Sequence, residues 1–109
     1  MAGQGDCVSI EDLEKRRTIY HVIDVRAPED YAAAHVNGAV NIPLDRLRDH
    51  AGGLPAGVIP LTVCGKGGGR SVEGARILRE LGRPDAVWLC GGTDAWISRG
   101  PERKGLGSQ

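Results

Sequence analysis

Short apolar runs rich in β-branched residues alternate with helical patterns along this chain. The clearest run, residues 19–25, is almost continuously apolar, as expected of a strand that is covered on both faces. Strands that alternate with helices are typical of βα units around a parallel sheet. We therefore predict an α/β fold with a parallel sheet, whose strands cover residues 8–10, 19–25, 39–42, 61–63 and 86–89.

Helical patterns fill the segments between these runs. Ser9 and Asp12 have the spacing of a capping box, and Pro28 suits the first turn of a helix. Gly82 suits the position just after a helix end, and Thr93 is expected to cap the last helix, which contains Trp96. The helices are predicted from Ser9 to about residue 17 and over 28–35, 44–50, 71–81 and a short segment after 93.

Length and charge limit the classes of protein that fit. The 109 residues suffice for one domain, with a core over about residues 8–100 and a loose C-terminal tail. Fourteen basic and fourteen acidic residues give a net charge of zero, which argues against a nucleic-acid binder. No apolar run is long enough to span a membrane, and the first seven residues do not resemble a signal peptide. We therefore expect a cytoplasmic protein.

The three cysteines, Cys7, Cys64 and Cys90, are too few and too odd in number for the framework of a disulfide-rich secreted domain. We assign Cys7 no role. Cys64 follows a predicted strand and precedes the loop Gly65, Lys66, Gly67, Gly68, Gly69 and then Arg70. If these thiols have a role, we expect it to be chemical.

The loop after Cys64 favours a thiolate. Its glycines allow successive backbone amides to turn inward, because no Cβ blocks left-handed dihedrals. The helix that follows presents its unpaired amides and positive dipole end to the same place. Lys66 and Arg70 add positive charge, so the pKa of Cys64 is predicted to be lowered. In an α/β sheet, ligands bind at the carboxyl ends of the strands, where this loop lies.

Two other interpretations of the loop fit its residues less well. Cys64 could be an inert buried residue followed by a tight connection, but glycines, cations and a helix start converge on this one thiol. Nucleotide binding fits poorly, because Lys66 stands before the last glycines and Arg70 stands where the final glycine of a dinucleotide motif belongs. The histidines do not have the spacing of a zinc site. We expect neither a metal nor an organic cofactor.

Three separated motifs resemble the single-domain rhodanese family over about residues 8–100. The first half contains Asp24-Val25-Arg26, then Glu29, Tyr31, His35, Gly38-Ala39 and Asn41-Ile42-Pro43, with Ala34 in place of the usual glycine. The second half contains Cys64 with Arg70-Ser71, and Gly91-Gly92-Thr93-Asp94-Ala95-Trp96.

The resemblance implies a rhodanese-like fold, a five-stranded parallel sheet flanked by helices on both faces. It implies a thiosulfate sulfurtransferase-type enzyme in which Cys64 takes a sulfane sulfur from a small anionic donor, such as thiosulfate or a persulfide. The resulting persulfide would pass its sulfur to a thiophilic acceptor such as cyanide or a thiol. Residues Gly65, Lys66, Gly67, Gly68, Gly69 and Arg70 would bind the substrate. Asp24, Arg26, His35 and Trp96 match positions that are mostly structural in the family.

The spacing between Cys64 and Arg70 departs from the pattern of many single-domain rhodaneses and leaves other functions open. Five residues separate Cys64 from Arg70, where many single-domain rhodaneses have four. This Cys-x5-Arg spacing is also that of rhodanese-fold phosphatases and arsenate reductases, whose loops hold a tetrahedral oxyanion. Against this interpretation, Val63 rather than His precedes the cysteine, and no sequence feature supplies an obvious general acid, although Asp94 and Glu73 are within possible reach. A third interpretation is a non-enzymatic sulfur-carrier or docking module.

Cys90 follows the strand predicted beside that of Cys64. It is a candidate resolving thiol for a Cys64 persulfide or sulfenate, which requires Cα atoms within about 7 Å. The alternative is a buried cysteine before a glycine turn.

Overall fold

The computed structural model describes residues 7–99 of the chain. The elements are β1 (Cys7–Val8), α2 (Ile10–Lys15), η1 (Arg17–Ile19), β2 (Tyr20–Asp24), α3 (Pro28–Ala33), β3 (Val40–Asn41), η2 (Leu44–Arg46), α4 (Leu47–His50), η3 (Ala51–Gly53), β4 (Ile59–Val63), α5 (Arg70–Glu80), β5 (Val87–Leu89) and a helix over residues 92–99. The loose tail predicted after residue 100 lies outside the described residues.

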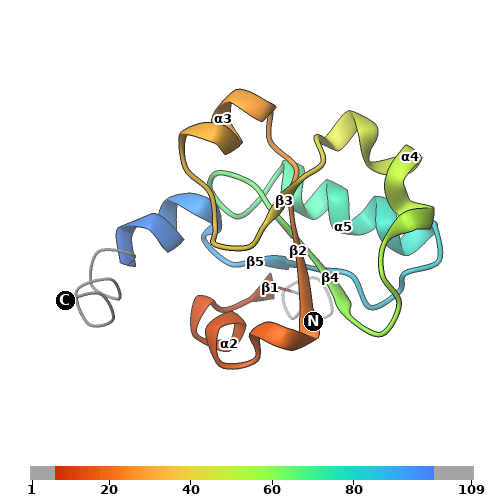
Figure 1. Ribbon diagram of the computed structural model, residues 1–109, viewed down its shortest axis with the longest axis horizontal. Coiled ribbons are helices and arrows are strands. Elements are labelled where there is room, and N and C mark those ends of the chain that lie inside the picture. Colours follow the sequence, from red (N-terminus) through yellow and green to blue (C-terminus); the bar gives the residue numbers. More distant parts are fainter. Residues whose placement is uncertain (1–6, 100–109) are drawn as a thin grey trace.

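The five strands form one parallel sheet, as predicted, and their order is β1-β5-β4-β2-β3 (Figure 1). β4 is the middle strand, and its Leu61 lies opposite Val22 of β2 and Val87 of β5. In a parallel sheet the carboxyl ends of all strands meet at the same edge. The residue that follows β4, Cys64, is therefore placed at the centre of that edge.

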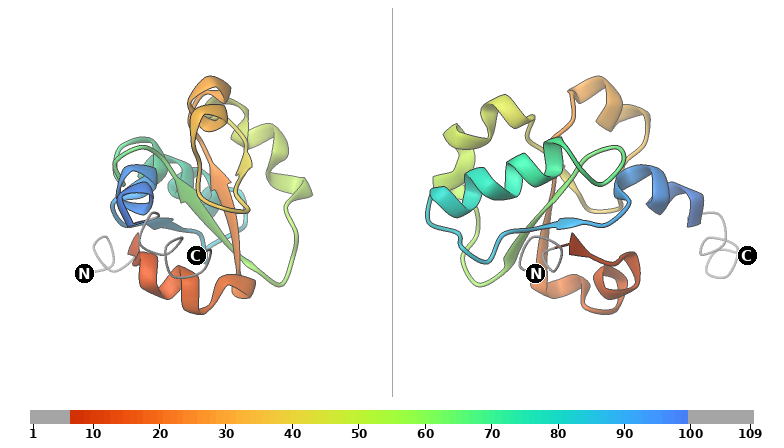
Figure 2. Two further views of the ribbon diagram at one scale, coloured as in Figure 1. Left: turned by 60° about the vertical axis from the view of Figure 1, so that its left-hand side comes forward. Right: turned by 180° about the vertical axis from the view of Figure 1, so that it is seen from behind.

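Helices cover both faces of the sheet. α5 and α4 pack on one face through buried side chains that include Leu78 and Leu47. α2 and the last helix pack on the other face through Leu13 and Trp96. Figures 1 and 2 show α5 and α2 on opposite sides of the sheet. This two-sided cover explains the nearly continuous apolar run of β2, of which Ile23 is 0% exposed.

Several element boundaries differ from those predicted. The first strand ends at Val8, and Ile10 already belongs to α2, because the Ser9 side chain caps that helix by accepting from the amide of Asp12 at 3.0 Å. β4 begins before Pro60 rather than after it. Pro60 is tolerated there because the pairing with β5 begins only at Leu61, so no ladder bond to β5 is lost.

Family-motif residues in the first half of the chain stabilise the turn after β2 through hydrogen bonds. Arg26 lies beside Asp24 and donates to both of its carboxylate oxygens, in a pair that is almost fully buried. Asn41 donates to the carbonyl oxygens of both Asp24 and Arg26 at 3.0 Å. His35 stacks on Tyr31, with ring centroids 3.9 Å apart. These contacts confirm the structural role predicted for Asp24, Arg26 and His35.

No helix within residues 7–99 is long and apolar enough to cross a membrane.

Candidate functional site

Cys64 lies at the end of the middle strand, where the sequence predicts it. The residue is 4% exposed, and it is the free cysteine among the described residues. The loop 65–69 leaves the strand here and leads directly into α5. The loop therefore has to curl above the sulfur.

The loop has a curvature that glycine permits. Gly67 has φ +85°, and a Cβ at this position would lie 2.4 Å from the amide nitrogen of Gly91. No other residue type fits such a close approach at such a dihedral. Because Gly67 packs on the Gly91 backbone, the loop is held against the turn that follows β5.

Burial and hydrogen bonds change the pKa of the Cys64 thiol in opposite directions. The Cys64 thiol lies 2.8 Å from the carbonyl oxygen of Gly68, to which it donates, and 3.2 Å from the Ser71 hydroxyl. Burial is the largest single influence and raises the pKa of the thiol. The Ser71 hydroxyl and the amides of Ser71, Gly67 and Lys66 together outweigh it, so the pKa of Cys64 lies below that of an ordinary thiol. The direction agrees with the prediction, but the main causes of the lowered pKa are the Ser71 hydroxyl and the amides rather than the charges of Lys66 and Arg70.

Two cations stand at the mouth of this site. A pocket of about 500 Å³ is lined by Cys64, Gly65, Lys66, Gly68, Gly69, Arg70 and Asp94. Lys66 pairs with Asp94 at 3.4 Å, and both side chains are largely exposed, so this pair adds little stability. Within residues 7–99, Arg70 has no such ion pair. All the predicted loop residues line the pocket except Gly67, whose amide contributes to the lowered pKa of Cys64.

The last helix holds the loop from the other side. The amide of Thr93 donates to the Cys64 carbonyl oxygen at 2.8 Å, and the amide of Asp94 donates to that of Gly65 at 2.9 Å. Thr93 is therefore not the predicted cap: it lies inside a helix that begins at Gly92, and its hydroxyl is buried without a hydrogen bond. The helix start is determined by these bonds to the loop rather than by a side-chain cap.

Cys90 is joined to Cys7 by a disulfide, with their Cα atoms 5.1 Å apart. β1 lies beside β5, which brings these residues together although 83 positions separate them in the sequence. We predicted no role for Cys7, and the disulfide corrects that. A Cys90 thiol that could resolve Cys64 exists only after this disulfide is reduced, so the resolving role stays a prediction.

Asp94 and Glu73, the two carboxyls considered for the role of a general acid, differ in position. Asp94 lines the Cys64 pocket. Glu73 lies on the exposed face of α5, paired with Arg76, and the hydrogen bond from Arg76 holds the pKa of Glu73 below its usual range. A carboxyl that stays ionised is a poor general acid. Among residues 7–99 no group of three or more His, Cys, Asp or Glu side chains has a metal-binding arrangement.

Sequence reasoning missed the Ser71 hydroxyl as part of the site. The available signal was a serine in the first turn of the helix that follows a cysteine loop. Such a hydroxyl can reach back to a sulfur at the preceding strand end.

A family model, the rhodanese-like domain, matches residues 9–99. The chain belongs to this family. The thiosulfate sulfurtransferase PspE of Escherichia coli K12 is 40% identical over 63 residues, which are 57% of this chain and 61% of PspE. The adenylyltransferase and sulfurtransferase uba4 of Ogataea parapolymorpha is 33% identical over 91 residues, which are 82% of this chain and 23% of uba4. The rhodanese-like chain thus spans less than two thirds of either relative.

Solved structures agree with the fold. A rhodanese-related protein from Thermoplasma volcanium is 29% identical, with a TM-score of 0.77 over 86% of this chain and 92% of that chain. The human single-domain sulfurtransferase TSTD1 is 24% identical, with a TM-score of 0.76 over 86% of this chain and 96% of that chain. These similarities confirm the five-stranded rhodanese-like architecture.

Proposed function

We propose that this chain is a sulfurtransferase in which Cys64 carries the sulfur. The observation that carries the proposal is the buried Cys64 sulfur, which faces the amides of Lys66, Gly67 and Ser71 together with the Ser71 hydroxyl. These donors stabilise a negatively charged sulfur in place. The named relatives PspE and uba4 support the same class of reaction.

The first half-reaction loads the cysteine. The Cys64 thiolate attacks the sulfane sulfur of a small anionic donor such as thiosulfate, a new S–S bond forms, and sulfite leaves with the electron pair of the broken bond. Arg70, at the mouth of the pocket and without an ion pair among the described residues, attracts the donor. The outer sulfur of the persulfide then takes the negative charge that the loop amides stabilise.

The second half-reaction removes the outer sulfur from the Cys64 persulfide. A thiophilic acceptor, cyanide or a thiol, attacks the outer sulfur, and Cys64 leaves as a thiolate. No external acid is needed, because the leaving thiolate is stabilised by the same donors. We expect neither a metal nor an organic cofactor in this cycle.

Phosphate or arsenate chemistry is the second candidate. The five-residue spacing from Cys64 to Arg70 and the position of Asp94 on the Cys64 pocket favour it. This reaction needs a protonated acid at the leaving group. If Asp94 is that acid, Asp94→Asn abolishes aryl phosphate turnover and leaves sulfur transfer in place.

Thiocyanate formation from thiosulfate and cyanide tests the proposal, with aryl phosphate hydrolysis and arsenate reduction followed on the same preparation. We expect thiocyanate from the native chain and none from Cys64→Ser. Turnover of aryl phosphate or arsenate without thiocyanate would replace sulfur transfer by oxyanion chemistry. If a folded native chain shows none of these activities, the docking interpretation applies.

A further inference from the structure

A second and larger pocket adjoins the site. Its volume is about 840 Å³, within the range of pockets that bind small organic molecules. It opens between the start of α3, the end of β3 and the η2–α4 segment. Its lining residues are mostly apolar or small: Val25, Ala27, Pro28, Asn41, Ile42, Pro43, Leu44, Asp45, Arg46, His50 and Arg70. We refer to these residues together as the side pocket.

Arg70 connects the side pocket to Cys64. Arg70 lines both the side pocket and the smaller pocket that Cys64 lines. The two pockets are therefore neighbours on the same edge of the sheet. Thiosulfate and cyanide have too few atoms to fill both spaces, so the side pocket has room for a ligand that neither of them supplies.

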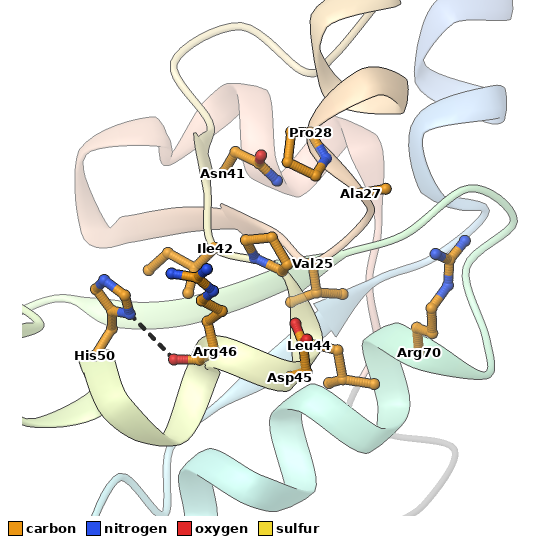
Figure 3. Close-up of a pocket in the computed structure, with 11 residues that line it drawn as sticks. Val25, Ala27, Pro28, Asn41, Ile42, Leu44, Asp45, Arg46, His50 and Arg70 are labelled. Carbon is orange, nitrogen blue, oxygen red and sulfur yellow. Dashed lines mark hydrogen bonds between the residues drawn. The ribbon is translucent and has the colours of Figure 1, made fainter.

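The charges of the side pocket lie at its two sides. Figure 3 shows the guanidinium groups of Arg46 and Arg70 on opposite sides of Val25, with Ile42 beside Arg46. Within residues 7–99 no carboxylate lies within ion-pair distance of either arginine. One carboxylate, that of Asp45, also lines the pocket. The pocket thus has apolar residues along its middle and, at each side, an arginine that has no ion pair among the described residues.

His50 and Asn41 add polar atoms to the same space. The Nδ1 atom of His50 lies 3.0 Å from the Arg46 carbonyl oxygen (Figure 3). Asn41 uses its amide nitrogen on Asp24 and Arg26. Its side-chain oxygen is therefore an acceptor for a ligand, while Arg46 is a donor for an anion.

We propose that the side pocket binds the sulfur acceptor, and that this acceptor is an organic thiol with a carboxylate remote from its sulfur. Arg46 binds the carboxylate, the apolar residues contact the carbon chain, and the thiol passes Arg70 to the persulfide. This assignment rests on the proposed sulfur transfer, because it names the acceptor of that reaction.

The transfer step balances without a further reactant. The acceptor thiol loses its proton to solvent, and its sulfur attacks the outer sulfur of the Cys64 persulfide. One S–S bond forms and one breaks, and Cys64 leaves with the electron pair as a thiolate. The product is an organic persulfide.

Two measurements test the side pocket, with glutathione as the carboxylate-bearing probe. The first is calorimetric binding of S-methylglutathione, which cannot accept sulfur, so its result does not depend on catalysis. The variants are Arg46→Gln and, as a matched control, Arg48→Gln, an exposed arginine nearby that pairs with Glu80 and does not line the pocket. We expect Arg46→Gln to weaken binding about tenfold, the loss expected for one charge-assisted hydrogen bond in a partly exposed site. Arg48→Gln should leave binding unchanged.

The second measurement is the discharge of a preloaded Cys64 persulfide by glutathione and by its diethyl ester, whose carboxylates are blocked. Arg46→Gln should slow discharge by glutathione about tenfold more than discharge by the ester. Equal effects on the two thiols, or binding that Arg46→Gln does not weaken, would overturn the side-pocket assignment while Cys64 still loads. Failure of Cys64 to load, with Arg46-dependent binding intact, would instead refute the sulfur transfer and with it the acceptor role.

Discussion

The carbonyl oxygen of Cys64 accepts a 2.8 Å hydrogen bond from the amide of Thr93. This bond joins the strand that carries the sulfur to the helix that follows β5. The two segments are in close contact at this point. A Cβ on the adjacent Gly92 would lie 2.6 Å from the same carbonyl oxygen. Gly91 and Gly92 therefore pack directly against the loop that follows Cys64, although they are distant from it in the sequence.

Gly92→Ala is expected to impair the site. Gly92 has φ +63°, and its added methyl group would meet backbone atoms of Cys64, Gly65 and Gly67. Strain of this kind costs about 1–3 kcal/mol, and it displaces the amides that face the sulfur. We expect thiocyanate formation to fall at least about tenfold, the equivalent of some 1.4 kcal/mol.

Gly53→Ala is the control for that substitution. Gly53 lies in η3, and its added methyl group would meet nothing within 4 Å. It should keep native activity. Equal rates of thiocyanate formation by Gly92→Ala and Gly53→Ala would show that sulfur transfer does not need the close packing at Gly92.

Ser71→Ala is expected to raise the pKa of Cys64. The Ser71 hydroxyl lies 3.2 Å from the sulfur and lowers the pKa of the thiol, so its removal leaves less thiolate near neutral pH. The rate of iodoacetamide alkylation increases with pH as the thiolate forms, and its midpoint should move to higher pH in the variant. At pH 7 we expect alkylation to slow about threefold to tenfold.

Ser98→Ala provides the comparison, because its hydroxyl bonds the Asp94 carbonyl oxygen on the exposed side of the last helix. An unchanged alkylation midpoint in Ser71→Ala would mean that the backbone amides alone set the charge of the sulfur.

The local structure around Cys64 could be predicted because it depends on short patterns. A strand, a cysteine, five loop residues and a helix follow one another directly, so strand end, loop and helix start were correct within one residue. The Thr93 bond and the Cys7–Cys90 disulfide could not be predicted in this way. Both join segments that only the order of strands in the sheet brings together, and neither leaves a periodic signal.

Removal of the Cys7–Cys90 disulfide is expected to destabilise the fold. The bond closes a loop across 83 positions, and loss of a native disulfide from a small domain costs about 2–5 kcal/mol. Urea unfolding of the native chain should therefore shift to lower urea on addition of dithiothreitol. Cys7→Ser should show the lower midpoint without reductant and no further shift with it. A native midpoint that dithiothreitol leaves unchanged would contradict a stabilising disulfide.

Asp24→Asn is expected to cost more stability than the loss of an exposed ion pair. Asp24 is 0% exposed and accepts from Arg26 through both oxygens. Removal of one partner of a buried pair leaves the other charge uncompensated, at a cost of about 3–5 kcal/mol. Glu73→Gln removes the exposed partner of Arg76 and should change the urea midpoint very little. Similar midpoints for the two variants would show that the Asp24 pair does not hold the turn after β2.

The side pocket had no signature in the sequence. Its lining comes from the ends of β2 and β3, from η2, from α4 and from the first residue of α5. No motif links Arg46 to Arg70, and only the assembled sheet edge places both on one pocket. The residues that resemble the family could be assigned from their spacing, whereas a specificity pocket depends on how separate segments meet.

The most direct test of sulfur transfer is the intact mass of the chain after brief incubation with thiosulfate in the absence of added reductant. The native chain should gain the mass of one sulfur atom and lose it on addition of cyanide, and Cys64→Ser should gain none. A native chain that gains no sulfur, or a Cys64→Ser chain that gains as much as the native one, would contradict the assignment of Cys64 as the sulfur carrier.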